Sequence, residues 1–517
     1  GLWETSLSFA RNGGLDVAIE QCNGQGVCRK DTGVMCPSYQ ATREEMHSTR
    51  GRANLLRAMI SKPMSLRAVG ESSSSLNGRQ VHLVPVQVLL HRLGLDTGSQ
   101  NTRLTRPALP RNDMIEAAAA SLDLCLACKG CKAECPSGVD MAKLKYAFQA
   151  EYYKTHRRQL RDYVFGYFHV TAGLAAAVAP LSNILIRLPL FKRIAARLLG
   201  ITPHRPFPKF SRRRPRLQTR EARKDGERVI FLGDAFARYI EPETGQAALD
   251  ILSDCGYEVH VLPVTGAGAS FLSKGFLDQA RSHAKRVLDL IEKIDPGRQA
   301  PVVAIEPPEI YALKHDYADL LPERAAEIIA RVGNVWLLDE FLLRSDKFHD
   351  LRIANIGSNV PGKRLEKRTV RFHPHCHQRA EGPSPDGLPN GTMATVELLR
   401  ICGYDVELMD TGCCGMAGTF GYEAEHYEVS MKVGELKLFP LLRPPSEPPS
   451  TPGLRTEGLS NTSRSDLREV PLRSGVEGVV STGAACRMQI RQGTGVEALH
   501  PVMLVRDFVR SRSSIKT

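Results

Sequence analysis

The pattern of hydrophobic and polar positions in the C-terminal half of the chain occurs twice. Ala248–Phe271 and Thr395–Phe420 each predict a helix that ends at Cys-Gly-Tyr, then a strand of alternating apolar and polar residues, then a glycine-rich loop. Further apolar strands are expected before and after the copies, at Val229–Phe236 and Val302–Glu309 for the first, and at Val370–His377 and Val479–Cys486 for the second. This alternation favours two α/β units, each with a largely parallel sheet.

The N-terminal half shows helical periodicity around two cysteine-rich stretches. Arg50–Ile60 and Met114–Leu124 are predicted to be helices, and Glu71–Gln80 a polar loop between them. The apolar stretch His169–Leu188 contains a proline, and its uninterrupted apolar run is too short to cross a bilayer. We therefore expect a buried or surface-lying amphipathic helix there.

Two polar stretches indicate connecting segments. Thr202–Arg228 is rich in proline and arginine and is predicted to be an interdomain linker. Its arginines are interpreted as a solvated surface or as a docking segment for an anionic membrane or an acidic partner. The low-complexity residues 443–467 predict a disordered insertion.

Composition narrows the class of protein. The 517 residues are enough for two to four domains, and 42% hydrophobic and 24% charged residues are ordinary for a globular protein. The net charge of +13 favours anionic partners, but base-stacking aromatic residues are scarce, so no nucleic-acid partner is expected. The chain begins with Gly1 and shows no signal-peptide pattern, and we expect that another segment precedes it.

Cysteine usage indicates metal binding. There are 13 cysteines, and most of them occur in tight clusters rather than as scattered pairs. This distribution is typical of metal ligation in a reducing compartment, so a cytoplasmic location is expected.

The segment CLACKGCKAECP (Cys125–Pro136) is a complete C-x2-C-x2-C-x3-C-P array. In paired-cluster ferredoxins the first three cysteines hold one iron–sulfur cluster, and the cysteine before proline crosses over to the other. The array therefore predicts a 4Fe–4S cluster on Cys125, Cys128, Cys131 and, by the same crossover rule, Cys36 of the Met-Cys-Pro stretch. Structural zinc is the alternative.

The segment CNGQGVC (Cys22–Cys28) resembles that array, with Gln25 in place of the middle cysteine. By the crossover rule a reciprocal site would use Cys22, Cys28 and Cys135. Three thiolates suit a 3Fe–4S cluster or an incomplete 4Fe–4S cluster with a labile iron. A vestigial site with two ordinary buried thiols is the alternative.

Four cysteines of the second repeat predict a third site at the carboxyl ends of its strands. Aligned with the first repeat, these cysteines all meet other residues: Cys376 meets Ala235, Cys413 meets Gly266, Cys414 meets Ala267 and Cys486 meets Glu309. Their loss as a set is what a four-ligand site predicts. The bound species could be an iron–sulfur cluster or zinc, or Cys413–Cys414 could be a redox-active dithiol.

The remaining cysteines and the nearby histidines have different interpretations. Cys255 and Cys402 match each other at the two helix ends and are interpreted as structural. His373, His375 and His377 surround Cys376 and are candidates for extra ligands or proton carriers.

Together these motifs resemble the iron–sulfur half of FAD-linked 2-hydroxy-acid dehydrogenases, of the D-lactate, D-2-hydroxyglutarate and glycolate oxidase types. The resemblance is carried by CNGQGVCRKDTGVMCPSYQATREEMHSTRGRANLLR, LDLCLACKGCKAECPSGVDMAKLK, TGCCGMAGTFGYE and STGAACRMQI. The last two are similar to the cysteine-rich CCG domain that is shared with heterodisulfide reductase subunits. The final CxxC of many CCG domains is absent, since Gln489 follows Cys486 at that spacing.

The resemblance implies an electron-transfer protein. A flavin, on a missing domain or a partner subunit, would oxidise the hydroxy acid, and the clusters would pass the electrons to a quinone or cytochrome. Peripheral contact with the inner membrane is a further expectation. The alternatives are a heterodisulfide reductase-like thiol/disulfide protein and a zinc-stapled scaffold.

The expected fold class is α+β and multidomain, with a helical two-cluster ferredoxin-like domain followed by two α/β CCG-type repeats. The predicted boundaries are 1–155 for the iron–sulfur domain, 156–228 for a helical segment and basic linker, 229–365 for a cysteine-free repeat, and 366–517 for the cysteine-containing repeat.

Overall fold

The computed structural model describes residues 5–60, 111–213, 215, 227–353, 368–443 and 476–513. The predicted loop Glu71–Gln80 lies outside the described residues, as do all but the first residue of the predicted insertion 443–467 and most of the linker beyond Arg213. The described part mixes helices with two small parallel sheets, in agreement with the α+β class, while the domain boundaries stay a prediction.

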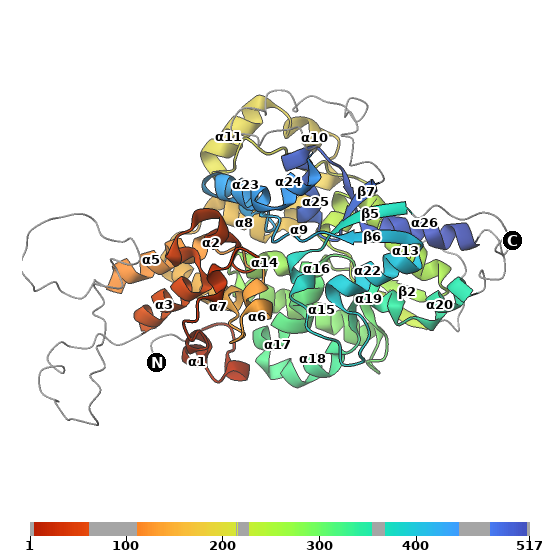
Figure 1. Ribbon diagram of the computed structural model, residues 1–517, viewed down its shortest axis with the longest axis horizontal. Coiled ribbons are helices and arrows are strands. Elements are labelled where there is room, and N and C mark those ends of the chain that lie inside the picture. The colour runs from red at the N-terminus through yellow and green to blue at the C-terminus, as the bar shows by residue number, and fades with distance from the viewer. Residues whose placement is uncertain are drawn as a thin grey trace, which may run out of the picture.

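Short helices and loops form the N-terminal part, drawn in red and orange in Figure 1. The two predicted helices are present, as α3 (Thr49–Ile60) and α5 (Arg111–Asp123). Apolar residues of both helices, among them Leu56 and Leu122, are buried in the same core. The other helices here are α1 (Leu15–Glu20), α2 (Pro37–Thr42), α6 (Gly130–Glu134) and α7 (Met141–Thr155).

The apolar stretch at 169–188 does not form the single helix that the sequence predicts. It is divided into α9 (Phe168–Ala177) and α10 (Leu181–Leu185), because Pro180 lacks the amide hydrogen that a continuous helix needs. Helices α8 (Leu160–Gly166) and α11 (Pro189–Leu199) flank the pair. Among the described residues, the structure contains no helix both long and apolar enough to cross a bilayer.

The first part of the predicted linker is packed rather than solvated. The Thr202 amide donates to the Tyr422 carbonyl over 2.8 Å, and Arg205 is only 2% exposed. The Arg205 guanidinium donates to Ser430 Oγ over 2.9 Å. These contacts fix the segment against the second repeat and correct the expectation of a solvated linker for this part of it.

Two four-stranded parallel sheets follow, and both have the same strand order. The first has the order β2-β1-β3-β4 and the second β6-β5-β7-β8, so the repeat predicted from the sequence appears as one topology used twice. The first sheet contains β1 (Arg228–Phe231), β2 (Glu258–Val261), β3 (Val302–Ala304) and β4 (Val335–Leu337); the second contains β5 (Arg368–His373), β6 (Tyr404–Leu408), β7 (Val476–Ser481) and β8 (Ala498–Leu499). The sequence pattern had not indicated β4 and β8.

Helices cover the sheets of both repeats (Figure 1). In the first repeat they are α12 (Ala235–Tyr239), α13 (Pro242–Asp254), α14 (Ala269–Ser273), α15 (Leu277–Ile294), α16 (Pro307–Tyr311), α17 (Tyr317–Leu320), α18 (Ala325–Val332), α19 (Leu338–Leu343) and α20 (Asp346–Ile353). In the second they are α21 (Cys376–Arg379), α22 (Gly391–Ile401), α23 (Tyr427–Leu436), α24 (Leu438–Leu442), α25 (Ala484–Thr494) and α26 (Pro501–Ser513).

The repeats pack against each other reciprocally. The helix after the fourth strand of each repeat contacts the helix after the first strand of the other, so α26 packs on α13 and α19 on α22. Phe231, Phe372 and Val505 are buried in one core that both repeats share. The cysteine-free repeat is therefore part of the structure that holds the cysteine-containing one in place.

Candidate metal centres

The four cysteines predicted to hold one cluster line a common cavity. Cys36 caps the N-terminus of α2, Cys125 and Cys128 lie in the loop between α5 and α6, and Cys131 lies on α6. All four are buried free thiols. The loop residue Ala127 has a φ of +50°, which turns the chain sharply between two of the cysteines. We call this group the central site.

A buried guanidinium lies beside the central site. Arg52 is 1% exposed, and its Nη1 donates to Cys36 Sγ over 3.2 Å. Its Nη2 donates to Ser38 Oγ over 2.8 Å and its Nε to the Ser121 carbonyl over 2.9 Å. Among the described residues, no carboxylate forms an ion pair with Arg52. Burial opposes its charge, yet the neighbouring cysteine sulfurs raise the pKa of Arg52 above its ordinary value.

A second buried basic residue, Lys145, contacts the backbone of the loop that carries Cys125. Lys145 Nζ donates to the carbonyls of Cys125, over 2.6 Å, and Asp123, over 3.3 Å. Burial lowers the pKa of Lys145. Lys129 differs, because it is ion-paired with Asp140 and Asp316, at 3.3 and 3.0 Å. The charge of Lys129 is thus balanced by carboxylates, whereas no carboxylate within the described residues is ion-paired with Lys145.

Sequence reasoning gave Arg52 no specific role and did not consider Lys145. The sequence could have indicated a buried role for Arg52, because it lies on the apolar stripe of α3. The other residues of this stripe, all buried, are Leu55, Leu56 and Met59. A cation on a buried helical stripe needs a negative partner, and that requirement points to a neighbouring anion.

The residues of the incomplete array pack against one core but differ in burial. Cys28 is buried, and its pKa is raised by burial and, to a smaller extent, by the nearby sulfurs of Cys36 and Cys22. Cys22 and Cys135 are half-buried, and no hydrogen bond among the described residues joins Cys135 to either partner. Gln25 is exposed. The incomplete array therefore lies nearer the surface than the central site.

The four cysteines of the second repeat form a row of contacting sulfurs. Contacts run from Cys376 to Cys413, from Cys413 to Cys414, and from Cys414 to Cys486. Contact with the Cys413 side chain holds the pKa values of Cys376 and Cys414 well below the ordinary thiol value, and the contacts along the row raise those of Cys413 and Cys486. Thiolates are the form that binds iron or zinc. We call this group the cysteine-rich site.

Parallel strands place these cysteines. Cys376 begins α21 after β5, Cys413 and Cys414 follow β6, and Cys486 lies in α25 after β7. Because the three strands are parallel, their carboxyl ends lie at one edge of the sheet. This edge is where a parallel sheet normally binds its ligands.

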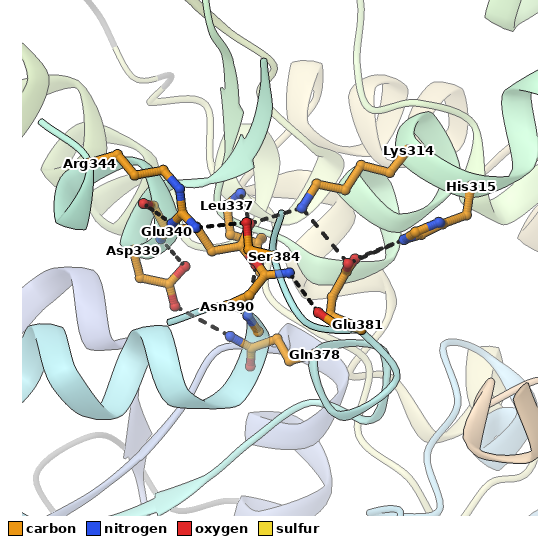
Figure 2. Close-up of polar contacts among 12 residues, drawn as sticks. Lys314, His315, Leu337, Asp339, Glu340, Arg344, Gln378, Glu381, Ser384 and Asn390 are labelled. Atoms are coloured by element: carbon orange, nitrogen blue, oxygen red, sulfur yellow. Dashed lines mark hydrogen bonds and ion pairs between the residues drawn. The ribbon is translucent and has the colours of Figure 1, made fainter. Parts of the chain in front are cut away.

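A polar network between the repeats holds α21 in position (Figure 2). Gln378 of α21 donates to Asp339 of α19 over 3.3 Å. Lys314 Nζ lies 3.0 Å from Glu340 and 3.9 Å from Glu381, so a buried ion pair joins the same two parts. Burial raises the pKa of Asp339 to about 7.

The first repeat fills the equivalent place with a carboxylate. Glu309, which aligns with Cys486, accepts hydrogen bonds from the amides of Ala267, over 2.5 Å, and Ala269, over 3.4 Å. A Cβ on Gly266 would lie 2.9 Å from the Glu309 carboxyl group. Gly266, Ala267 and Glu309, which align with three of the four cysteines, therefore also lie together in the first repeat, where a carboxylate bonds to the loop amides. Cys255 and Cys402 differ, since both are buried in the shared core at the ends of α13 and α22.

The three histidines near Cys376 have different partners. His375 caps α21, and its Nδ1 accepts from the His377 amide over 3.1 Å. His377 Nε2 donates to the Ala127 carbonyl of the central site over 3.2 Å. His373 Nδ1 lies 2.7 Å from Thr411 Oγ1. Of these three histidines, His377 is the one that contacts both the cysteine-rich and the central site.

The central and cysteine-rich sites are adjacent. Cys128 and Cys413 are buried in one apolar cluster with Leu126 and Phe420. The Gly412 backbone also approaches the first array closely, since a Cβ there would lie 3.0 Å from the Gly33 carbonyl oxygen.

Comparison with known protein families identifies one domain of the chain. Residues 370–439 match the family of the CCG cysteine-rich domain. This range contains Cys376, Cys413 and Cys414. No solved structure matched the chain.

The relatives are more specific. The chain is 22% identical to the D-2-hydroxyglutarate dehydrogenase of Escherichia coli (strain K12) and 23% identical to that of Pseudomonas putida, and each alignment covers 95% of this chain and 43% of the relative. It is 27% identical to a subunit of the anaerobic glycerol-3-phosphate dehydrogenase of Escherichia coli (strain K12), over 72% of this chain and 82% of the relative. The chain thus spans less than half of the longer relatives. These matches confirm the resemblance to the iron–sulfur half of FAD-linked dehydrogenases.

A charged network joins the central site to the second repeat. His426 Nε2 lies 2.7 Å from Asp123, at the end of α5, and its Nδ1 lies 3.2 Å from Glu423. Burial opposes its charge, but the hydrogen bond to Asp123 and the ion pair with Glu423 raise the pKa of His426 to about 9.

This pKa predicts a loss of stability at alkaline pH. Because the folded-state pKa of His426 is raised, its contribution is complete below about pH 6.5 and is lost as the pH rises through about 9. At about 1.4 kcal/mol per pKa unit, this contribution is at most about 3.5 kcal/mol. We expect urea unfolding at pH 7 and pH 9.5 to show this fall for the wild type but not for His426→Gln. The half-exposed His260→Gln variant should keep the wild-type pH dependence.

Proposed function

We propose that this chain is the iron–sulfur electron-transfer portion of an FAD-linked 2-hydroxy-acid dehydrogenase, an oxidoreductase. The names of the relatives, D-2-hydroxyglutarate dehydrogenase and anaerobic glycerol-3-phosphate dehydrogenase, support a role in dehydrogenation. A flavin on another domain or subunit would take a hydride, which carries two electrons, from the hydroxy acid. This chain would then pass these electrons singly to a quinone or cytochrome.

Buried basic groups without a carboxylate ion pair are the observation that carries this proposal. Arg52 lines the central site and Lys145 donates to the Cys125 carbonyl, and neither is ion-paired with a carboxylate in the described part of the chain. An isolated buried charge costs several kcal/mol, whereas a cluster held by thiolates is anionic. Four buried cysteines that line one cavity beside two cations therefore fit a 4Fe–4S cluster on Cys36, Cys125, Cys128 and Cys131 better than neutral thiols.

The positions of the three sites suggest an order of electron transfer. Cys131 lies on α6 and Cys135 caps its end, so one short helix links the incomplete array to the central site. The apolar cluster around Cys128 and Cys413 links the central site to the cysteine-rich site. Clusters at these positions would supply one-electron transfer. Electrons would enter at the half-buried first array, which would hold a 3Fe–4S or incomplete 4Fe–4S cluster, and leave through the cysteine-rich site.

The two alternative functions, a thiol/disulfide reductase and a zinc-stapled scaffold, would use the cysteine-rich site differently. The lowered pKa of Cys414 would suit a thiol/disulfide reductase, yet Cys413 and Cys414 are only 5% and 4% exposed, which restricts a disulfide substrate. A zinc-stapled scaffold would fill the same thiolates but carry no electrons.

Membrane contact belongs to the same proposal. The helices α9 to α11 expose many apolar side chains, including Leu174, Leu181, Leu190 and Leu198, each about two-thirds exposed. No aspartate or glutamate occurs from Tyr163 to Arg220, although arginines and lysines are frequent. Apolar side chains within a basic surface suit peripheral binding to anionic lipid, which would bring the chain close to a membrane quinone.

The proposed function requires iron and acid-labile sulfide in the protein. We expect anaerobically purified full-length chain to be brown and to show cluster EPR signals that change on dithionite reduction. Cys22→Ser should remove an oxidised-state signal of the 3Fe type, and Cys255→Ser, in the core, should leave the cluster signals unchanged. Colourless protein with stoichiometric zinc would support the scaffold instead.

Arg52 predicts opposite effects on the loaded and empty protein. In the loaded protein, Arg52→Met removes the partner of an anionic centre and should lower the free energy of unfolding by about 3 kcal/mol or more. In the empty protein the same change removes an unpaired buried cation, and it should be neutral or stabilise by about 1–4 kcal/mol. Chemical unfolding of both forms, with the exposed Arg286→Met as control, measures this difference. Equal effects on the two forms would exclude the charge pairing.

The membrane contact predicts lipid-dependent binding. The full-length chain should cosediment with vesicles that contain anionic phosphatidylglycerol and much less with pure phosphatidylcholine vesicles, because the apolar surface is set among basic residues. Replacing Leu174, Leu181 and Leu190 with Ser should weaken binding at least about tenfold, since each would remove apolar burial. The same change at exposed Ile329 serves as control. Equal binding to both kinds of vesicle by wild type and variant would contradict the proposal.

A further inference from the structure

His373 places a nitrogen atom among the sulfurs of the cysteine-rich site. It is the last residue of β5, and its nearest ring nitrogen lies within 4.8 Å of Cys414 Sγ and Cys486 Sγ, which are equally close to each other. All three residues are buried. Donor atoms about 2.0–2.3 Å from a common metal are at most about 4.6 Å apart, so the three atoms need to move little to share one.

The two ring nitrogens of His373 have different environments. Nδ1 lies 2.7 Å from Thr411 Oγ1, and the same oxygen accepts a hydrogen bond from Arg379 over 3.2 Å. Nε2 is buried and has no hydrogen-bond partner among the described residues. The imidazole ring lies beside Cys414, and Nε2 makes no hydrogen bond to that sulfur. A metal-binding histidine typically has this arrangement, with one nitrogen fixed by an outer partner and the other free for the metal.

The internal repeat gives independent support. His373 follows Phe372, just as Leu232 follows the aligned Phe231, so Leu232 is the counterpart of His373. Leu232 is fully buried and apolar. The imidazole is therefore absent from the first repeat together with the four aligned cysteines. If His373 served only to pack the core or to end the strand, the first repeat would be expected to keep a histidine at this position even without the cysteines.

The neighbouring histidines are occupied in other ways. His375 Nδ1 caps α21, and His377 Nε2 is bonded to Ala127. His377 Nδ1 also lacks a partner among the described residues, but it is not within the group of ligand atoms that His373 forms with Cys414 and Cys486.

We propose that His373 Nε2 is a metal ligand of the cysteine-rich site, which therefore has a mixed cysteine–histidine donor set. This proposal rests on the proposed function, in that the site must hold an iron–sulfur cluster or a metal ion. Replacing a thiolate with a neutral imidazole reduces the negative charge on a cluster and raises its reduction potential. A centre of this kind would be a favourable last acceptor for electrons that arrive from the all-cysteine central site.

Hyperfine coupling to nitrogen tests the ligand directly. The full-length, anaerobically purified chain is labelled with ¹⁵N-histidine, and the reduced cysteine-rich centre is studied by pulsed EPR. We expect the strong coupling of a directly bound nitrogen, which changes between ¹⁴N and ¹⁵N protein and disappears in His373→Leu. Leucine is the residue that the first repeat carries at this place, which makes the substitution compatible with the fold. His260→Gln serves as the control and should keep the coupling.

A second variant covers the case in which His373→Leu loses the centre altogether. Thr411→Val keeps the imidazole but removes its outer partner, and it should weaken metal retention against a chelator by about 10–100-fold. If the cysteine-rich site of the purified full-length chain holds zinc, Co²⁺ replaces it as the spectroscopic probe. The visible absorption of the bound Co²⁺ should then shift toward that of all-sulfur ligation in His373→Cys.

The outcomes separate this inference from the proposed function. A bound cluster without directly coupled nitrogen, or with coupling that persists in His373→Leu, overturns the histidine ligand and leaves the electron-transfer role intact. A cysteine-rich site without any metal, in a chain that contains iron and sulfide elsewhere, also overturns the ligand. Protein with neither iron nor sulfide overturns both proposals.

Discussion

The interior of the N-terminal part depends on an electrostatic requirement, namely that two buried cations need a negative partner. Lys129 and Lys314 show how this chain usually meets that requirement, because both are paired with buried carboxylates. Arg52 meets it with a cysteine sulfur, and the hydrogen bonds of Lys145 within the described residues go to carbonyl oxygens. Since carbonyl and neutral thiol groups carry no net charge, this interior is suited to a folded state that encloses an anion.

The cysteine-free repeat has a structural reason to persist without ligands. Its helices α13 and α19 bury the apolar faces of α26 and α22, and its residue Asp339, which binds Gln378, fixes the helix that begins with Cys376. Deleting the repeat would expose the core of the second one. Glu309 meanwhile accepts hydrogen bonds from two amides of the loop that corresponds to the Cys413–Cys414 loop, and these charge-assisted bonds stabilise it without a metal. One repeat can thus specialise as support while the other keeps the donor atoms.

The features that could be predicted from the sequence are those that depend on local spacing. Short intervals between Cys125, Cys128 and Cys131 place them in one loop whatever the rest of the chain does, and repeat periodicity indicated six of the eight strands in the described part of the chain. The short strands β4 and β8 carried too few residues to show a pattern. Tertiary contacts decided the rest. The loop pairing of Thr202 with Tyr422 is such a contact, and it has no signature in a proline- and arginine-rich sequence.

The candidate sites follow the same division between local and long-range information. Cysteine spacing identified the candidate donor sulfurs, but it could not rank the three histidines near Cys376. Their ring nitrogens differ in their hydrogen-bond partners, which are Thr411, the start of α21 and Ala127, and these partners are set by tertiary structure. The last of these contacts would link the proposed electron transfer to the fold. His377 and the apolar cluster around Cys128 and Cys413 form part of the contact between the N-terminal helices and the second repeat. On the proposed function, the contact that holds the two parts together would also carry electrons between their sulfurs, so a change that loosened the packing should slow electron transfer as well.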